Sequence, residues 1–290
     1  MLKEWPLVAF TILGQTAVGV FVVFLIPLML FPGAFAGLGD GEVLAPTLSM
    51  IDSLMILAVM ISFFHLRHPL RARKALSNLK TSWLSREVLT ALTFIGLVSL
   101  ALAVIRFGGR SNGPLTWIII AGGVSGALFL LSMVKIYMLP AVPVWNRIFT
   151  PVSFLFSALL IGTVAASVVL AGSGGSYELT KAAIIAAILL VLLDLSAAAL
   201  LAPPRGLSVR IPGASLRPHV KNAAYLIHTA RLALLAAGLG ALTSAWVDGF
   251  YTGIAGRKGP WKLILALILI LAGEAAGRVF FYSLVPRTRD

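Results

Sequence analysis

Eight long apolar runs follow one another along this 290-residue chain, and they constrain its fold more than any other feature. Each run approaches or exceeds the roughly 20 apolar residues that an α-helix needs to cross the ~30 Å hydrocarbon core of a bilayer. Glycine and proline residues gather between the runs, where helices are expected to end. We therefore predict an all-α, polytopic membrane protein, an eight-helix bundle that forms a single domain over residues 1–290. The expected spans cover residues 6–31, 44–66, 88–107, 115–138, 151–172, 180–202, 222–247 and 261–285.

Composition excludes the main alternatives to a membrane protein. The chain is 59% hydrophobic and 11% charged, whereas soluble domains average about 45–50% and about 25%. The same values exclude a disordered chain. The sequence has no cysteine, which excludes disulfides, thiolate-bound zinc and iron–sulfur clusters held by this chain alone. We predict no metal site, so any metal cluster that exchanges electrons here must belong to a partner.

Charge gives an expectation for orientation. An even number of spans places both termini on one face, which also receives most of the 23 lysine and arginine residues. By the positive-inside rule this face is cytoplasmic, although docking of an acidic partner would produce the same bias. The basic residues cap or connect apolar runs, so the net charge of +13 indicates anionic lipid or an acidic partner rather than nucleic acid.

Polar side chains within the spans are concentrated in the half of the membrane next to this face. Ionisable groups inside a bilayer are costly and usually mark function. Asp52 is the main exception, with Gln15 near the middle of the first span. The members of this intramembrane polar cluster, with its tyrosines, are His65, Glu87, Lys135, Tyr137, Asp194, His228, Arg231, Glu274, Arg278 and Tyr282.

Several members of the cluster also have purely structural interpretations. Glu274 and Arg278 are four residues apart, the spacing of an ion pair on one helix. Lys135 and Arg231 can extend to the interface, and Asp194 can pair with one of them. Taken together, however, the cluster predicts a pocket for an amphiphilic compound such as a quinone. Oxidation of a quinol needs hydrogen-bond partners for two ring oxygens and a base, which histidine and carboxylates can supply.

Three alternative functions use the same residues. His65 and His228 share a face and a rough depth, so they could hold one haem, but no span contains two histidines and haem is not favoured. An ion-coupled transporter or proton-translocating module would use Asp52, Asp194 and Glu274 as carriers. The crowding of charges into one half of the membrane argues against such a path. A structural tether without a quinone site is the third alternative.

The loop between the second and third spans resembles a known family. Residues 65–72 read HLRHPLRA, and residues 75–79 and 84–88 read ALSNL and LSREV. These motifs resemble the dimethyl sulfoxide reductase anchor-subunit family, which also has eight spans. Further similarity lies in residues 4–15 and 273–282.

The resemblance implies a haem-free membrane anchor of a molybdopterin oxidoreductase in the cytoplasmic (inner) membrane of a prokaryote. Such an anchor binds menaquinol and passes its electrons to an iron–sulfur subunit and a molybdopterin catalytic subunit during anaerobic respiration. By position, His65 would bind the quinol or act as a base, Glu87 would accept a proton, and Arg71, Ser77 and Asn78 would shape the loop. The family is usually drawn with its termini in the periplasm, opposite to the orientation that the charge bias favours.

Overall fold

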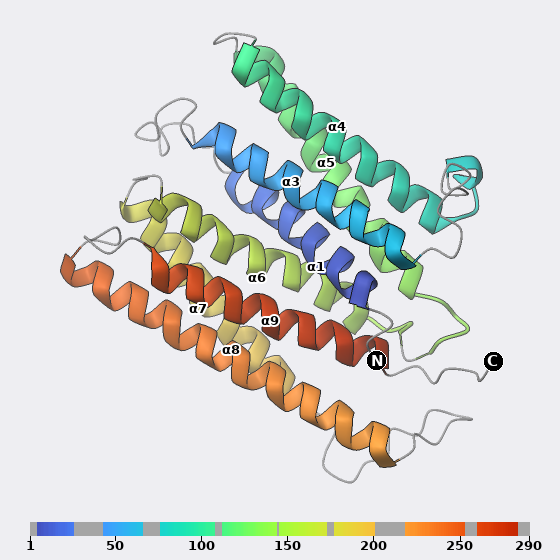
Figure 1. Ribbon diagram of the computed structural model, residues 1–290, viewed down its shortest axis with the longest axis vertical. Coiled ribbons are helices and arrows are strands. Elements are labelled where there is room, and N and C mark those ends of the chain that lie inside the picture. Colours follow the sequence, from blue (N-terminus) through green and yellow to red (C-terminus); the bar gives the residue numbers. More distant parts are fainter. Residues whose placement is uncertain are drawn as a thin grey trace.

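The computed structural model (Figure 1) describes residues 5–25, 43–65, 76–107, 112–143, 145–172, 177–200, 218–252 and 260–283. Eight helical segments in these ranges are long and apolar enough to cross a membrane, which confirms the predicted all-α architecture. They are α1 (Trp5–Val20) with the π-helical turn η2 (Phe21–Leu25), α3 (Leu44–Ser62) with the 3-10 turn η4 (Phe63–His65), α4 (Trp83–Phe107), α5 (Asn112–Tyr137), α6 (Phe149–Gly172), α7 (Tyr177–Leu200), α8 (Pro218–Thr252) and α9 (Trp261–Ser283). Because α1 begins and α9 ends at the same end of the bundle (Figure 1), we call this end the terminal end.

The observed helices differ from the predicted spans mainly at their boundaries. Helix α4 begins at Trp83, before the predicted start at residue 88, because its first turns accommodate both Arg86 and Glu87. Helix α8 extends beyond the predicted span 222–247 at both ends. The last part of the first predicted span, residues 26–31, lies outside the described residues.

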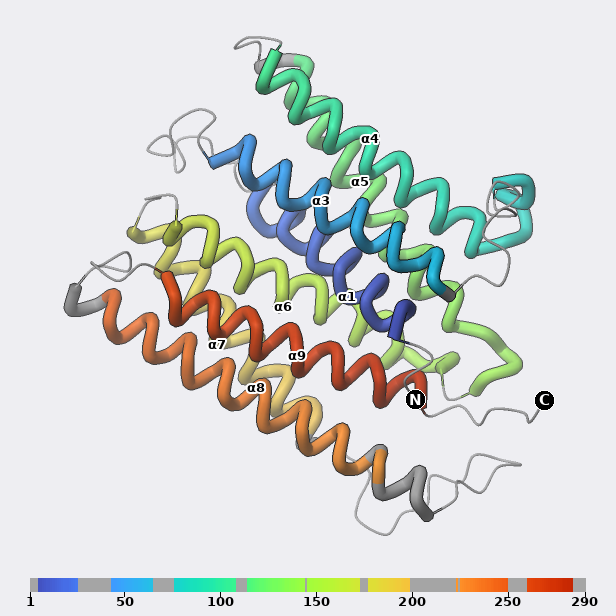
Figure 2. Tube along the Cα trace, in the orientation of Figure 1, coloured from blue at the N-terminus to red at the C-terminus, as the bar shows by residue number. Residues whose placement is uncertain are grey.

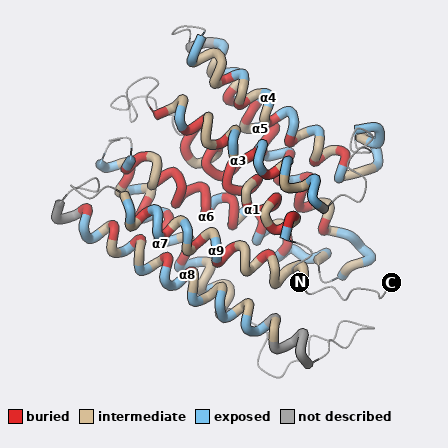
Figure 3. The backbone as a smooth tube through the Cα atoms, viewed as in Figure 1, coloured by how far each residue is buried: buried red, intermediate tan, exposed pale blue. Residues whose placement is uncertain are grey.

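Helices α1 and α6 form the centre of the bundle. They are the most buried of the candidate spans, and Figure 3 shows buried backbone concentrated along them. They approach backbone to backbone at Gly19 and Gly162. A Cβ atom added to Gly19 would lie 2.0 Å from the Ala158 carbonyl oxygen, and one added to Gly162 would lie 2.3 Å from the Gly19 carbonyl carbon. Small residues permit this separation, as is common between membrane helices.

This crossing provides a test of the fold. Replacing Gly19 by alanine is expected to destabilise the protein by about 1–3 kcal/mol, because the new methyl group meets backbone atoms that cannot move without separating the two helices. Gly96 is the matched control, since an added Cβ there has no atom within 4 Å. Thermal unfolding of the purified protein in detergent should show a lower melting temperature for Gly19→Ala only. Equal melting temperatures for the two variants would contradict this packing.

The eight helices form two sets of four with the same order of neighbours. Helix α1 packs on α3, α3 on α4 and α4 on α5, while α6 packs on α7, α7 on α8 and α8 on α9. Helix α9 also contacts α1, and α5 contacts α6, which joins the two sets. Figure 2 traces the backbone through the first set and then the second. The centre of the bundle therefore consists of the first helix of each set.

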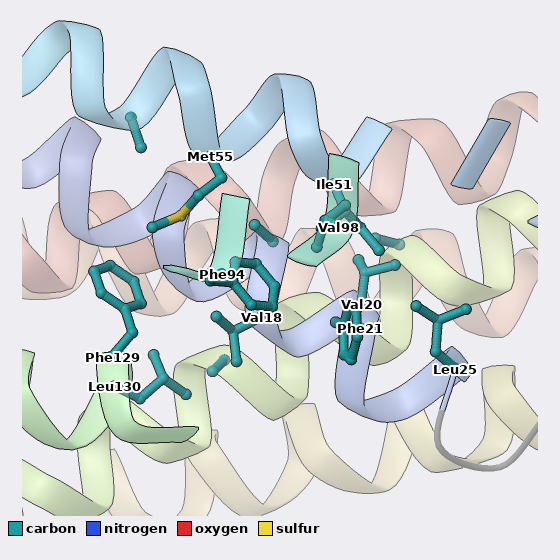
Figure 4. Packing of buried hydrophobic residues seen from close by; sticks show 14 of the residues in the cluster. Val18, Val20, Phe21, Leu25, Ile51, Met55, Phe94, Val98, Phe129 and Leu130 are labelled. Carbon is teal, nitrogen blue, oxygen red and sulfur yellow. The ribbon is translucent and has the colours of Figure 1, made fainter. Parts of the chain in front are cut away.

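An apolar core fills the first set of helices. In Figure 4, Val18 and Phe21 from the first span face Phe94 of α4, and Met55 of α3 lies nearby. The Phe21 and Phe94 rings pack edge to face with centroids 5.2 Å apart, a favourable arrangement for aromatic pairs. Phe129 of α5 is fully buried in the same cluster. Packing of these apolar side chains holds the helices of the first set together.

Candidate functional site

Four helices of the bundle are joined by a buried ion network. Arg231 of α8 donates through Nη2 to both carboxylate oxygens of Asp194 in α7, at 2.9 and 2.8 Å. The same atom donates to Glu274 of α9 at 3.2 Å. Glu274 also accepts a hydrogen bond from the Ser157 hydroxyl of α6 at 2.5 Å. One arginine therefore bridges carboxylates from two helices within the predicted membrane region.

Arg278 of α9 extends this network to α1. Its side chain is 3% exposed, and its Nη2 donates to Gln15 Oε1 at 3.3 Å, to Ser157 Oγ at 3.2 Å and to the Ser153 carbonyl oxygen at 3.4 Å. The guanidinium carbon lies 3.6 Å from the centre of the Phe154 ring, a cation–π contact. Among the described residues, no carboxylate lies within ion-pair distance of Arg278 and its Nε has no hydrogen-bond partner. Its positive charge is therefore stabilised by polar groups and an aromatic face.

An aromatic cluster lies beside Arg278 toward the terminal end. The Tyr137 ring of α5 lies with its centroid 5.4–5.6 Å from the rings of Trp145, Phe154, Phe281 and Tyr282. The Tyr282 hydroxyl donates to the Tyr137 hydroxyl at 2.8 Å. Trp145 Nε1 donates to the Phe281 carbonyl oxygen at 3.0 Å. The ends of α5 and α9 are thus held together by a hydrogen-bonded tyrosine pair.

Glu87 is an acidic residue that acts on this tyrosine pair. It lies in the second turn of α4 and is 6% exposed. Its charge acts electrostatically on both Tyr137 and Tyr282. Within the described ranges, its carboxylate forms no ion pair or side-chain hydrogen bond. A buried carboxyl group without a partner among the described residues can exchange a proton with a bound molecule.

The loop residues predicted for the site are described only in part. His65 ends the turn η4 directly after α3, and nothing further is described for its side chain. The neighbouring Phe64 ring lies 6.2 Å from the Trp5 ring, so the end of α3 is beside the beginning of α1. Ser77 and Asn78 form an exposed helical turn before α4, and Arg71 lies outside the described residues.

Comparison with known proteins identifies the family. The model of the family "DMSO reductase anchor subunit (DmsC)" matches residues 1–284. The protein belongs to this family. It is 32% identical over 291 residues to the anaerobic dimethyl sulfoxide reductase subunit YnfH of Escherichia coli K12, covering 97% of this sequence and 94% of that protein. It is 27% identical to the C subunit of the anaerobic dimethyl sulfoxide reductase from the same organism, with the same coverage. The corresponding C subunit from Haemophilus influenzae Rd is 27% identical over 297 residues, covering 98% and 95%.

The resemblance seen in the sequence is thereby confirmed. The protein is a multi-pass membrane anchor subunit of the anaerobic dimethyl sulfoxide reductase type, a class of protein that works in a complex with other reductase subunits. Having no cysteine, this anchor subunit holds no thiolate-ligated iron–sulfur cluster by itself.

The structure joins only part of the predicted polar cluster. Asp194, Arg231 and Glu274 form one ion network, which supports the proposed pairing of Asp194. The expected ion pair between Glu274 and Arg278 is not formed, because Glu274 turns to Arg231 and Ser157. Ser157 was not identified from the sequence, since a serine in an apolar run is too common to be a signal.

Two basic residues of the predicted cluster are not members of the ion network among the described residues, although His228 lies one turn before Arg231 on α8. Lys135, in the last turn of α5, has its Nζ 6.0 Å from the centre of the Trp83 ring. The His228 ring packs 5.5 Å from Phe280, and its Nε2 is buried without a hydrogen-bond partner among the described residues. Neither side chain hydrogen-bonds to the residues of the network in the part of the protein that the structure describes.

The residues considered for the alternative functions are also separated. Helix α8, which carries His228, lies across the bundle from the end of α3 that carries His65 (Figure 1). The structure thus does not bring together the two elements considered for haem ligation. Asp52 accepts a hydrogen bond from the Ser99 hydroxyl at 2.9 Å, between α3 and α4 and away from the Asp194 and Glu274 network.

Proposed function

We propose that the anchor subunit binds menaquinol at its terminal end and oxidises it, in a pocket bounded by the end of α3, the beginning of α4 and the ends of α5 and α9. The observation that carries this proposal is the buried carboxyl group of Glu87, which is unpaired among the described residues and near enough to the Tyr137–Tyr282 pair to act on it electrostatically. Oxidation of a quinol to a quinone releases two protons and two electrons. Glu87 accepts one proton, and His65, at the end of η4, accepts the other.

The surroundings of Glu87 suit an aromatic, amphiphilic ligand. Rings of Tyr137 and Tyr282 provide a surface on which a quinone ring can pack. Their hydroxyl groups provide hydrogen bonds to ring oxygens. The buried charge of Arg278 acts on both tyrosines and favours an anionic form of the bound quinol. Ser77, Asn78 and Arg71 keep the role that the family resemblance implies for them, which is to shape the loop of the quinol site.

The electrons leave the anchor subunit for a partner. We propose that the acceptor is an iron–sulfur subunit, which passes the electrons to a molybdopterin catalytic subunit during anaerobic respiration. This assignment rests on the family and on the absence of cysteine from this sequence. The same pocket can also reduce the quinone when the electron flow is reversed.

His65 provides the direct test of this site. In the assembled reductase, His65→Gln is expected to lower menaquinol-dependent turnover about tenfold or more, since glutamine keeps hydrogen bonds but cannot take up the proton. Dimethyl sulfoxide, the substrate named for the relatives, is the first acceptor to use.

The control uses a soluble reductant that delivers electrons directly to the catalytic partners. Turnover with this reductant should match that of the unmodified complex. His228→Gln is the matched histidine substitution, because His228 lies outside the proposed pocket, and it should keep quinol-dependent turnover. A His65→Gln complex that turns over normally with menaquinol would refute the assignment of the pocket.

A further inference from the structure

Helices α4 and α5 form a close antiparallel pair with a continuous apolar outer surface. On α5, exposed residues recur every three or four positions and form a stripe along the helix. On α4, a second stripe runs in the opposite direction and includes Leu89, Leu92 and Leu100. Members of the α5 stripe are Trp117, Ile120, Val124, Leu128 and Leu131. Figure 3 shows the exposed positions along α4. These stripes face the lipid in a membrane-spanning bundle.

Each stripe ends at the terminal end in a positive charge. Lys135 follows Leu131 by one turn of α5, and Arg86 precedes Leu89 by one turn of α4. Trp83 lies between these charges, with the Arg86 guanidinium carbon 4.2 Å and Lys135 Nζ 6.0 Å from the centre of its ring. Both cations therefore lie close to one indole ring, at the level where the apolar surface ends.

Arg86 is fixed in this position by the preceding loop. Its Nε donates to the Leu79 carbonyl oxygen at 2.9 Å, and its Nη2 donates to the Lys80 carbonyl oxygen at 2.7 Å. A guanidinium held in this way keeps free N–H groups for an oxyanion at little cost in side-chain entropy. Among the described residues, neither Arg86 nor Lys135 has a carboxylate within ion-pair distance.

Two lysines at the opposite end of the bundle differ in this respect. Lys181 lies 3.8 Å from a carboxylate oxygen of Glu178, and Lys262 forms an ion pair with Asp248. Both lysines also contact an aromatic ring, Tyr177 and Trp261 respectively. The aromatic contact is thus common to both ends, whereas the carboxylate partner that Lys181 and Lys262 have is missing at Arg86 and Lys135 among the described residues.

We infer that Arg86, Lys135 and Trp83 form a binding site for one anionic phospholipid. The phosphate of the headgroup lies between the two cations, the indole ring occupies the interfacial level, and the acyl chains follow the stripes of α4 and α5. A lipid fits better than an acidic protein, because both cations continue helix faces that are apolar and exposed along the bilayer. Interfacial tryptophan and basic residues at this depth are typical of headgroup contacts. This site does not depend on the proposed quinol pocket.

The experiment measures lipid binding to the purified reductase complex by native mass spectrometry after detergent removes loosely bound lipid. Phosphatidylglycerol and phosphatidylcholine are added separately. The double variant Arg86→Gln with Lys135→Gln is expected to bind phosphatidylglycerol about 30-fold more weakly, since each of the two basic residues near an anionic headgroup contributes on the order of 1 kcal/mol. Binding of phosphatidylcholine should not change.

Two further variants separate charge from folding. Lys181→Gln with Lys262→Gln makes the same change of net charge at the other end and should bind phosphatidylglycerol normally. Arg86→Lys with Lys135→Arg keeps the charges and should retain most of the binding. Unchanged phosphatidylglycerol binding in the glutamine double variant would overturn the inference. Release of the partner subunits with lipid binding intact would also overturn it, by showing that this surface docks a protein.

Discussion

Glu87→Gln is expected to lower menaquinol-dependent turnover of the assembled reductase about 100-fold, without loss of the complex from the membrane. Glutamine has nearly the same shape as glutamate, so it keeps the packing of this buried position. It cannot accept a proton, and positioned acid–base groups typically contribute 10²–10⁴-fold to rates. The loss should appear in kcat more than in KM, because proton transfer rather than binding is removed. Steady-state oxidation of a soluble menaquinol analogue provides the measurement.

A partly buried carboxyl group in the neighbouring helix serves as the control for this prediction. Asp52 lies in α3 and is hydrogen-bonded to Ser99, away from the tyrosine pair, so Asp52→Asn is expected to keep quinol turnover within about twofold. If Glu87→Gln and Asp52→Asn reduce turnover equally, the loss reflects a general disturbance of α4 and α3. If Glu87→Gln turns over at the normal rate, Glu87 does not take the proton from the quinol.

The eight spans could be predicted because hydropathy alone determines which segments can cross a bilayer. The boundaries of the spans could not be predicted from hydropathy, because the start of a helix depends on how its polar residues are accommodated. The beginning of α4 is an example. The Arg86 side chain lies over the Trp83 ring, and the Glu87 side chain is buried. Because both charged side chains are accommodated, a segment that looks too polar for a span is part of the helix.

The polar cluster could be located on one side of the membrane because successive spans alternate in direction. Its internal pairing could not be predicted, because it depends on how each helix is rotated and on which helices are neighbours. Glu274 and Arg278 have the spacing of a local ion pair. In the structure, Arg231 of a neighbouring helix binds Glu274, while Arg278 reaches Gln15 on a helix more than 200 residues away in sequence. Tertiary contacts therefore replace the local pair.

Such contacts explain how a bundle of apolar helices obtains a defined arrangement. Apolar side chains pack against lipid nearly as well as against each other, so burial alone selects helix neighbours weakly in a membrane. The network of Asp194, Arg231, Glu274 and Arg278 links α7, α8, α9 and α1 through specific hydrogen bonds. It also lies beside the tyrosine pair of the proposed pocket, so the same bonds that select neighbours also position the ends of α5 and α9.

Arg231→Met is therefore expected to be the most destabilising substitution in this region, with a cost of about 3–5 kcal/mol. Methionine fills much of the volume but leaves Asp194 and Glu274 without their shared counter-ion. The side chains of these carboxylates are only 12% and 4% exposed, so water cannot replace the arginine. The expected result is a large fall in the melting temperature of the purified protein and in the amount of anchor subunit recovered from membranes.

Removing the charges of Arg231, Asp194 and Glu274 together shows whether Arg231 stabilises the protein through its charge or through its shape. The triple variant Arg231→Met, Asp194→Asn and Glu274→Gln contains no uncompensated buried charge among these three positions and should recover a substantial part of the lost stability. Lys181→Met is the surface control, because its partner Glu178 has a side chain that is 76% exposed, and exposed pairs contribute about 0–1 kcal/mol. If the triple variant is no more stable than Arg231→Met, neutralising the two carboxylates recovers no stability. Arginine at this position would then act through its shape and not through its charge.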